Sequence, residues 1–134
     1  MMATQYFSIG EEERAVEILY GLKKNVEARC VDKIERGLRY PSIIYNLTKI
    51  LGEMDKDEEA LPLCDEGIEV CIDTSSLRLL PNITYNKVHS LYKVNDKAAA
   101  GILLREVYHA AGLLRQQELK SLAKAFAEKH NIIL

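Results

Sequence analysis

The sequence predicts an all-α protein: a right-handed stack of helical hairpins of the α-solenoid type, with about seven helices. Three observations predict it. Apolar residues recur at helical spacing along the chain, no segment alternates polar and apolar residues as a half-buried strand does, and one stretch repeats after 40 residues. Because composition is even from end to end, with no linker-like segment, we expect a single helical-repeat domain over residues 1–134.

The repeat divides the chain into units. A shift of 40 residues places Pro-Ser-Ile-Ile-Tyr-Asn, which begins at Pro41, on Pro-Asn-Ile-Thr-Tyr-Asn, which begins at Pro81. The match continues with Leu51 on Leu91, Ala60 on Ala100, Leu63 on Leu103 and Glu66 on Glu106. We expect a partial repeat in residues 1–30, full repeats in residues 31–73 and 74–112, and a C-terminal helix in residues 113–134.

The sequence leaves two alternatives for where the first helix of each unit begins. In the partial repeat it lies around residues 6–9 and is cut short by the chain start. In the full repeats it either opens at Pro41 or Pro81, or starts earlier, near Asp32 or Ser76, and is kinked at the proline. Both alternatives follow because an interior proline removes a backbone donor and clashes with the preceding turn.

Apolar stripes mark the second helix of each unit and the C-terminal helix. The stripes are Ala15, Ile18, Leu19, Leu22 and Val26; Ala60, Cys64, Gly67, Ile68 and Cys71; Ala100, Leu103, Leu104, Val107 and Ala111; and Leu119, Leu122, Ala123, Phe126 and Ala127. Between them lie stop and start signals. Asp55 with Glu58 can form a capping box, and Asp73 to Ser76 and Asn95-Asp96 are turn sequences.

At these residues the chain resembles the tetratricopeptide repeat family. The matching residues are Tyr45-Asn46-Leu47, Leu51, Asp55, Glu58 to Leu61 and Gly67-Ile68, then Tyr85-Asn86, Leu91 to Lys93, Asn95-Asp96 and Ala100. A small residue at Ala60 or Ala100 lets the two helices of a hairpin approach closely. Thr48 and Val88 replace the consensus glycine, and the repeat exceeds the usual ~34 residues, so the resemblance is to the broader superfamily.

More narrowly, the chain resembles the C-terminal part of Gram-positive helix-turn-helix transcriptional regulators of the Rgg and PlcR type. The resemblance lies in residues 39–47, Leu51-Gly52, residues 65–68, residues 77–81 and residues 85–87. It implies a regulatory, ligand-sensing and protein-interaction domain that binds a short peptide in a concave groove, behind a DNA-binding domain that this chain does not contain. The alternative is a stand-alone tetratricopeptide adaptor or dimerisation module with no small ligand.

Charge and hydropathy exclude other partners. Lys and Arg (18) nearly balance Asp and Glu (20), which leaves no basic patch for nucleic acid or anionic lipid. No apolar run approaches the ~20 residues that cross a bilayer, and the start of the chain does not resemble a secretory signal. We expect a cytoplasmic protein without direct nucleic-acid contact or membrane attachment, in which Cys30, Cys64 and Cys71 are unpaired core thiols.

The sequence contains no recognisable catalytic constellation. His89, His109 and His130 lie 20 and 21 residues apart, and the chain has no HExxH, no CxxC and no glycine-rich phosphate loop. We therefore expect no enzyme, no cofactor and no metal site.

A concave surface, formed by the first helix of each hairpin, is the expected binding site. The family's groove positions fall on Tyr45, Lys49, Asn82, Tyr85, His89 and Tyr92, with Thr4, Phe7 and Ser42 as further positions. Tyrosine rings offer contact area, Asn82 can pair with a peptide amide and carbonyl together, and Lys49 can meet a carboxylate. Asn46 and Asn86 are expected to bond side chain to backbone instead, and His89 has the alternative of being merely solvated.

Self-association is expected as well, as a homodimer alongside the peptide or protein partner. Tyr6, Phe7 and Ile9 would lie on the truncated helix, and the stripe from Ala15 to Val26 would face water on one side. A symmetric dimer would cover such a patch twice. The C-terminal helix, with Leu119, Leu122, Phe126 and residues 132–134, is the rival surface.

Overall fold

The computed structural model describes residues 11–29 and 32–134. This part is all-α, without a strand, and holds six helices. They are α1 (Glu12–Arg29), α2 (Lys33–Glu53), α3 (Asp57–Asp73), α4 (Leu80–Lys93), α5 (Lys97–Leu113) and α6 (Gln117–Lys129). The short helix predicted near Tyr6, Phe7 and Ile9, and Cys30, lie outside the described residues.

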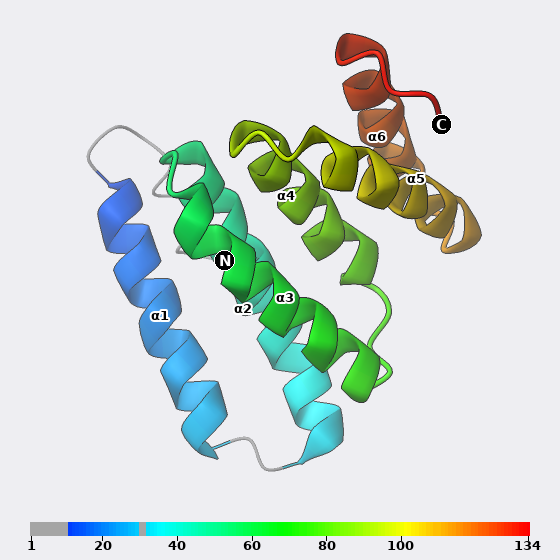
Figure 1. Cartoon of the computed structure of the whole chain (residues 1–134). Coiled ribbons are helices and arrows are strands. Elements are labelled where there is room, and N and C mark those ends of the chain that lie inside the picture. Colours follow the sequence, from blue (N-terminus) through cyan, green and yellow to red (C-terminus); the bar gives the residue numbers. More distant parts are fainter. Residues whose placement is uncertain (1–10, 30–31) are drawn as a thin grey trace.

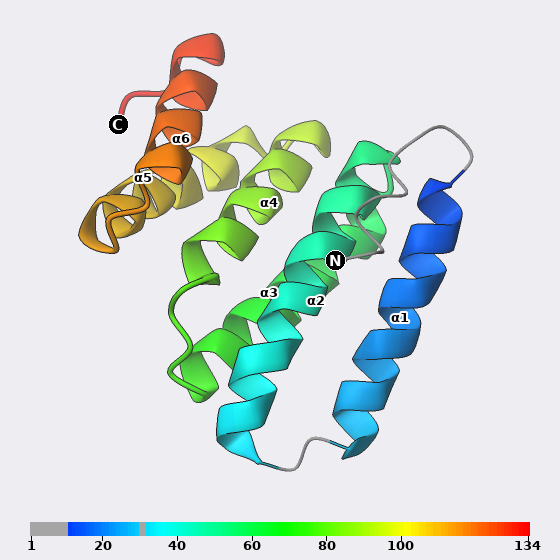
Figure 2. The ribbon, with the colours of Figure 1, turned by 180° about the vertical axis from the view of Figure 1, so that it is seen from behind.

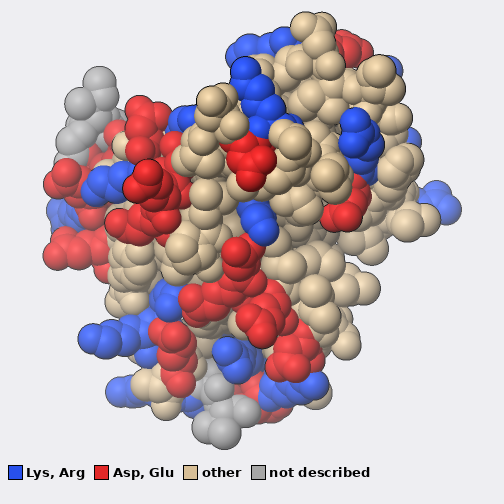
Figure 3. All heavy atoms as spheres, in the orientation of Figure 1, with Lys and Arg blue, Asp and Glu red and all other residues tan. Residues whose placement is uncertain are grey.

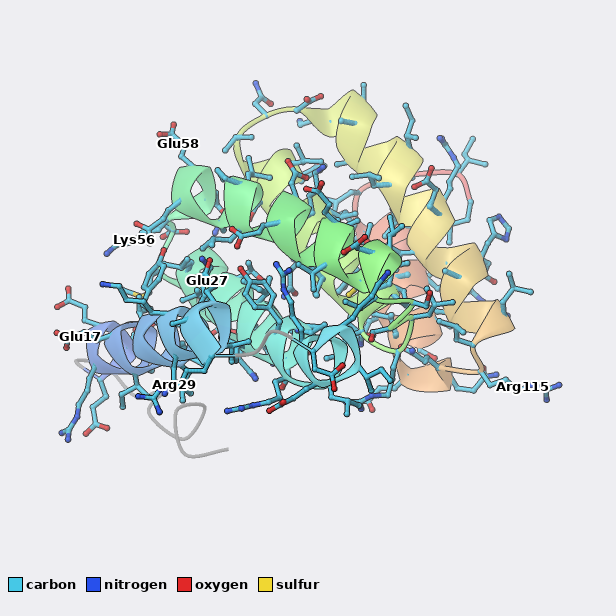
Figure 4. All side chains as sticks on the ribbon, turned by 90° about the horizontal axis from the view of Figure 1, so that it is seen from below. Glu17, Glu27, Arg29, Lys56, Glu58 and Arg115 are labelled. Carbon is cyan, nitrogen blue, oxygen red and sulfur yellow. The ribbon has the colours of Figure 1, made fainter. Side chains whose placement is uncertain are left out.

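Each helix packs against the next one along the chain, and α2 also packs against α4 (Figure 1). Viewed from behind, α2 and α6 lie in front of α3 and α5 (Figure 2). Figure 4, seen from below, shows the same two layers, with α3 and α5 at one side and α2 and α6 at the other. The two layers give the molecule two separate faces.

Helix bounds keep the 40-residue offset of the sequence repeat. Helices α3 and α5 are both 17 residues long and begin at Asp57 and Lys97, 40 positions apart. The residues that end α2 and α4 with a positive φ, Asp55 and Asn95, keep the same offset, and so do Ser75 and Arg115 at the ends of α3 and α5.

The two prolines take different roles. Pro81 lies in the first turn of α4, so its missing N–H costs nothing there. Pro41 lies inside α2, which begins earlier, after the N-cap Asp32 whose carboxylate accepts from the Ile34 N–H at 2.9 Å. The predicted capping box of Asp55 and Glu58 is wrong, because Asp55 has a φ of 59° and closes the C-terminus of α2.

The core consists of two apolar clusters that meet at α4. One joins α1 to α4 and includes Leu19, Ile44 and Ile83; the other joins α4 to α6 and includes Val88 and Phe126. Ala60 and Ala100 are fully buried, as the close approach of paired helices requires.

The stripe on α1 does not face water as expected. Ala15, Leu19 and Val26 are at most 1% exposed because they pack in the first cluster. Only Ile18 and Leu22, at the edge of the stripe, stay partly exposed, at 38% and 37%. The apolar patch predicted to drive dimerisation through α1 is therefore mostly used within the chain.

Candidate functional site

A hollow of about 450 Å³ lies between α2, α4 and α6, and we call it the inner hollow. Four of the six predicted site residues border it: Tyr45 and Lys49 from α2, and Asn82 and Tyr85 from α4. The other lining residues are Asn86, Gln116, Gln117, Glu118, Leu119 and Leu122. Three helices thus supply aromatic, amide, charged and aliphatic groups to one concave site.

Local helical geometry and one inter-helix bond position these side chains. Tyr45 and Lys49 are four residues apart, and Asn82 and Tyr85 three apart, so each pair shares a helix face. The Asn86 amide donates to the Tyr45 carbonyl oxygen at 3.1 Å and to the Thr48 hydroxyl at 3.0 Å. These bonds fasten α4 to α2 directly beneath the inner hollow.

The further predicted groove positions have separate outcomes. Ser42, half-buried on α2, accepts a hydrogen bond from the Asn46 amide through its carbonyl oxygen, at 2.9 Å. The structural role predicted for Asn46 and Asn86 is therefore confirmed. Thr4 and Phe7 lie outside the described residues.

Helix α6 forms the third wall. The Tyr85 hydroxyl donates to the Leu122 carbonyl oxygen at 3.3 Å, and the Tyr85 ring meets the Phe126 ring edge-on at 6.3 Å between centroids. Burial raises the pKa of Tyr85, so the hydroxyl stays protonated and able to donate at neutral pH.

His89 and Tyr92 do not line the inner hollow. They belong to a ring cluster with α6: the His89 ring lies 4.7 Å from Phe126, and the Tyr92 ring lies 5.6 Å from Phe126 and 4.1 Å from His130. These two predicted site residues thus help to hold α6 in place.

Protonation of His89 is disfavoured at this position. His89 keeps exposed surface, but its packing against α6 partly desolvates the ring and lowers its pKa. Repulsion from His130, Lys93 and Lys129 lowers it further, against a smaller opposing effect of Asp57. The neutral imidazole is therefore the form that suits the ring cluster.

Asn82 carries an unsatisfied acceptor. Its Oδ1 is buried and has no hydrogen-bond partner in the described part of the chain. A buried acceptor without a donor costs about 1–3 kcal/mol, so a donor brought by a ligand would recover stability. Gln116, by contrast, uses its side-chain amide to donate to the Arg78 carbonyl oxygen at 2.7 Å.

A smaller hollow of about 300 Å³ adjoins the inner hollow at Lys49 and Asn86. Its floor holds Asp57, which is 7% exposed, accepts from the Ser90 hydroxyl at 2.9 Å and pairs with Lys93 at 3.3 Å. Because hydrogen bonding and an ion pair satisfy this carboxylate, the arrangement serves to join α3 to α4.

The described residues include no group of three or more His, Cys, Asp or Glu that could hold a metal ion. Cys64 and Cys71 are buried free thiols, and burial raises their pKa values to about 12 and about 11. Both are therefore poor nucleophiles at neutral pH. Among the helices described, none combines the length and apolarity needed to span a membrane.

The sequence did not predict the contribution of α6. Helix α6 folds back toward α4 and lines the inner hollow with Gln117, Glu118, Leu119 and Leu122. No residue of the 40-residue repeat predicts this contact. The available signal is the apolar stripe of the C-terminal helix, which the sequence also offers as the rival dimer surface.

No family model, no curated protein and no solved structure matches this chain.

Proposed function

We propose that this chain is a tetratricopeptide-like binding module, with a right-handed stack of hairpins, that holds a short linear peptide in the inner hollow. The observation that supports it is the meeting of Tyr45, Lys49, Asn82 and Tyr85, from two repeats, around one hollow. The buried Oδ1 of Asn82, one of these lining residues, has no hydrogen-bond partner within the described residues. A volume of about 450 Å³ lies within the range of ligand sites.

The lining groups define the peptide. Tyr45, Tyr85 and Leu122 favour an apolar side chain, and the Asn82 amide suits a backbone N–H and carbonyl. Lys49 favours an acidic group or a terminal carboxylate at the α2 side, whereas Glu118 favours a basic one at the α6 side. The peptide is thus short, partly apolar and charged with opposite signs at its two ends.

Selection from a random peptide library followed by fluorescence polarisation tests this proposal. Asn82→Ala removes the amide that would pair with the peptide backbone and should lower the affinity for the selected peptide about tenfold. Lys49→Ala should lower the affinity for acidic peptides selectively. Lys24→Ala, on the exposed surface of α1, is the matched control and should change nothing. Unchanged affinity in both site variants would place the peptide elsewhere.

The regulatory role rests on the resemblance to the Rgg and PlcR type of regulator. We propose that peptide binding in the inner hollow alters DNA binding by the gene product that contains this domain. Electrophoretic mobility of promoter DNA with and without the selected peptide measures this. An unchanged DNA affinity would favour the adaptor alternative.

Homodimerisation is the remaining part of the proposal, now assigned to α2. Ile34 and Leu38, four residues apart on one helix face, are 74% and 73% exposed. Light scattering should show a 30 kDa species that Leu38→Asp splits and Leu122→Asp does not, given the chain mass of 15.2 kDa. A concentration-independent monomer would reject the dimer.

A further inference from the structure

The layer opposite α2 and α6 has its own apolar groove, which we call the outer groove. It is a hollow of about 450 Å³ between α3 and α5, with α4 as its floor. Its apolar lining includes Ile68 and Ile72 from α3, Leu80 from α4, and Leu103 and Val107 from α5. Ile72 is 62% exposed, which is costly for a side chain of this size unless something covers it.

The outer groove exists because of how the helices pack. Helices α3 and α5 each pack closely against α4 but not against one another. Figure 4 shows them at the same side of the molecule. A hollow therefore remains between the C-terminal parts of α3 and α5, whereas α2 and α4 close against each other on the opposite layer.

Negative charge borders this groove. Helix α3 contains seven carboxylates and neither Lys nor Arg, and Figure 3 shows its acidic side chains as a diagonal band across the front face. At the groove, Asp65 pairs with Lys87. Glu69 on α3 and Glu106 on α5 have no ion pair within the described residues, so the two sides of the groove each present an uncompensated carboxylate.

We propose that the outer groove binds a basic amphipathic helix of a partner protein, with aliphatic residues on one face and Lys or Arg on both flanks. A helix satisfies its own backbone groups, whereas an extended peptide would leave its N–H and C=O groups against an apolar floor. Charge complementarity then sets the flanks: basic side chains on either side of the aliphatic stripe would meet Glu69 on α3 and Glu106 on α5.

This surface is distinct from the inner hollow, and the two share no lining residue. The inner hollow presents both signs of charge and several amides, which suit an extended peptide. The outer groove presents an apolar floor between Glu69 and Glu106. Its one cation among the described residues, Lys87, is paired with Asp65, which suits a basic helix. One chain can thus engage a peptide on one layer and a partner helix on the other.

The probe is a synthetic 18-residue helical peptide with Leu at every third or fourth position and Lys on both flanks. Fluorescence polarisation measures its affinity at low and at moderate salt. We expect binding that weakens with salt, and that falls about tenfold in the double variant Glu69→Lys with Glu106→Lys. The single variant Ile72→Asp should reduce binding similarly, and because this side chain is exposed the fold should survive.

Matched controls separate this groove from general attraction to an acidic surface. Glu17→Lys with Glu128→Lys makes the same charge change on α1 and α6, and Figure 4 shows Glu17 pointing away from the helices. This control should bind the probe nearly as the unaltered chain does, and so should Tyr85→Phe in the inner hollow. A peptide with Ser in place of Leu should not bind.

Three outcomes would overturn the proposal. Equal loss in the two charge-reversed doubles would show non-specific attraction. Binding by the Ser-substituted peptide would show that the apolar floor is not used. A dimer in the absence of probe that Ile72→Asp splits would assign the outer groove to a second copy of this chain.

Discussion

Asn46 and Asn86 lie at equivalent repeat positions, and the side-chain amide of each donates hydrogen bonds. The Asn46 amide donates to Ser42 within its own helix, whereas the Asn86 amide crosses to the Tyr45 carbonyl and the Thr48 hydroxyl of α2. Both residues recur because the fold repeats, and in both the side-chain amide donates to a backbone carbonyl oxygen. A repeated asparagine therefore predicts a side-chain to backbone hydrogen bond.

His89 should make stability depend on pH. Its pKa in the folded chain lies below the ordinary value of 6.5, chiefly through burial and then through His130, Lys93 and Lys129. The folded state thus binds fewer protons than the unfolded state, so the stabilisation is complete above about pH 6.5 and is lost as the pH falls through the folded pKa.

Chemical denaturation between pH 7.5 and pH 5 measures this effect. The free energy of unfolding should decline with acidification, and the decline should be smaller in His89→Gln. His109→Gln, on the exposed surface of α5, is the control and should follow the unaltered chain. Identical slopes for His89→Gln and the unaltered chain would contradict the argument.

Helix ends show where element prediction failed. Helices α2 to α6 each end with a non-glycine residue of positive φ: Asp55, Ser75, Asn95, Arg115 and Asn131. The turn closes in the same way each time, as when the Lys56 N–H donates to the Leu51 carbonyl at 2.8 Å. Glycine is the usual sequence signal for this turn. Because residue 55 is an aspartate, the sequence predicts a helix start there instead.

Helix packing also depends on a glycine where α3 contacts α2 and α4. A Cβ on Gly67 of α3 would lie 2.5 Å from the Ile44 Cγ2 atom and 3.3 Å from the Ile83 Cδ1 atom. Gly67→Ala should therefore destabilise the fold by about 1–2 kcal/mol, because overpacking of α3 against α2 and α4 outweighs the gain in helix propensity.

Gly21→Ala is the matched control. A Cβ there meets nothing within 4 Å, so helix propensity acts alone and the variant should gain about 0.5–1 kcal/mol. Urea denaturation compares the two variants. A stabilised Gly67→Ala would show that α3 can move away from Ile44 without cost.

At the scale of the whole molecule, the sequence predicts most of the fold, and four of the six predicted site residues line the inner hollow. The 40-residue register and the helical class follow from spacing along the chain, and the resemblance to the tetratricopeptide family placed Tyr45 and Tyr85 at one groove. The third wall does not, because the approach of α6 to α4 depends on ring contacts of Phe126 and His130, which have no repeat equivalent. The spacing of residues along the chain does not predict contacts between residues that lie outside the repeat.

Division of the core into two clusters has a consequence for unfolding. In a linear array, each unit is stabilised mainly by its neighbours, so damage at one end stays local. Phe126 is 7% exposed and contacts the rings of Tyr85, His89, Tyr92 and His130. Phe126→Ala should lower the free energy of unfolding by about 3–5 kcal/mol, and α5 and α6 should be destabilised first.

Hydrogen exchange resolves where that cost falls. In Phe126→Ala, amide protection should drop in α5, α6 and the C-terminal half of α4, while α1 to α3 keep theirs, because the first cluster from Leu19 to Ile83 does not include Phe126. Leu122→Ala removes a side chain that is 48% exposed and serves as the control, with a much smaller change. Uniform loss of protection through all six helices would mean that the two clusters unfold as one unit.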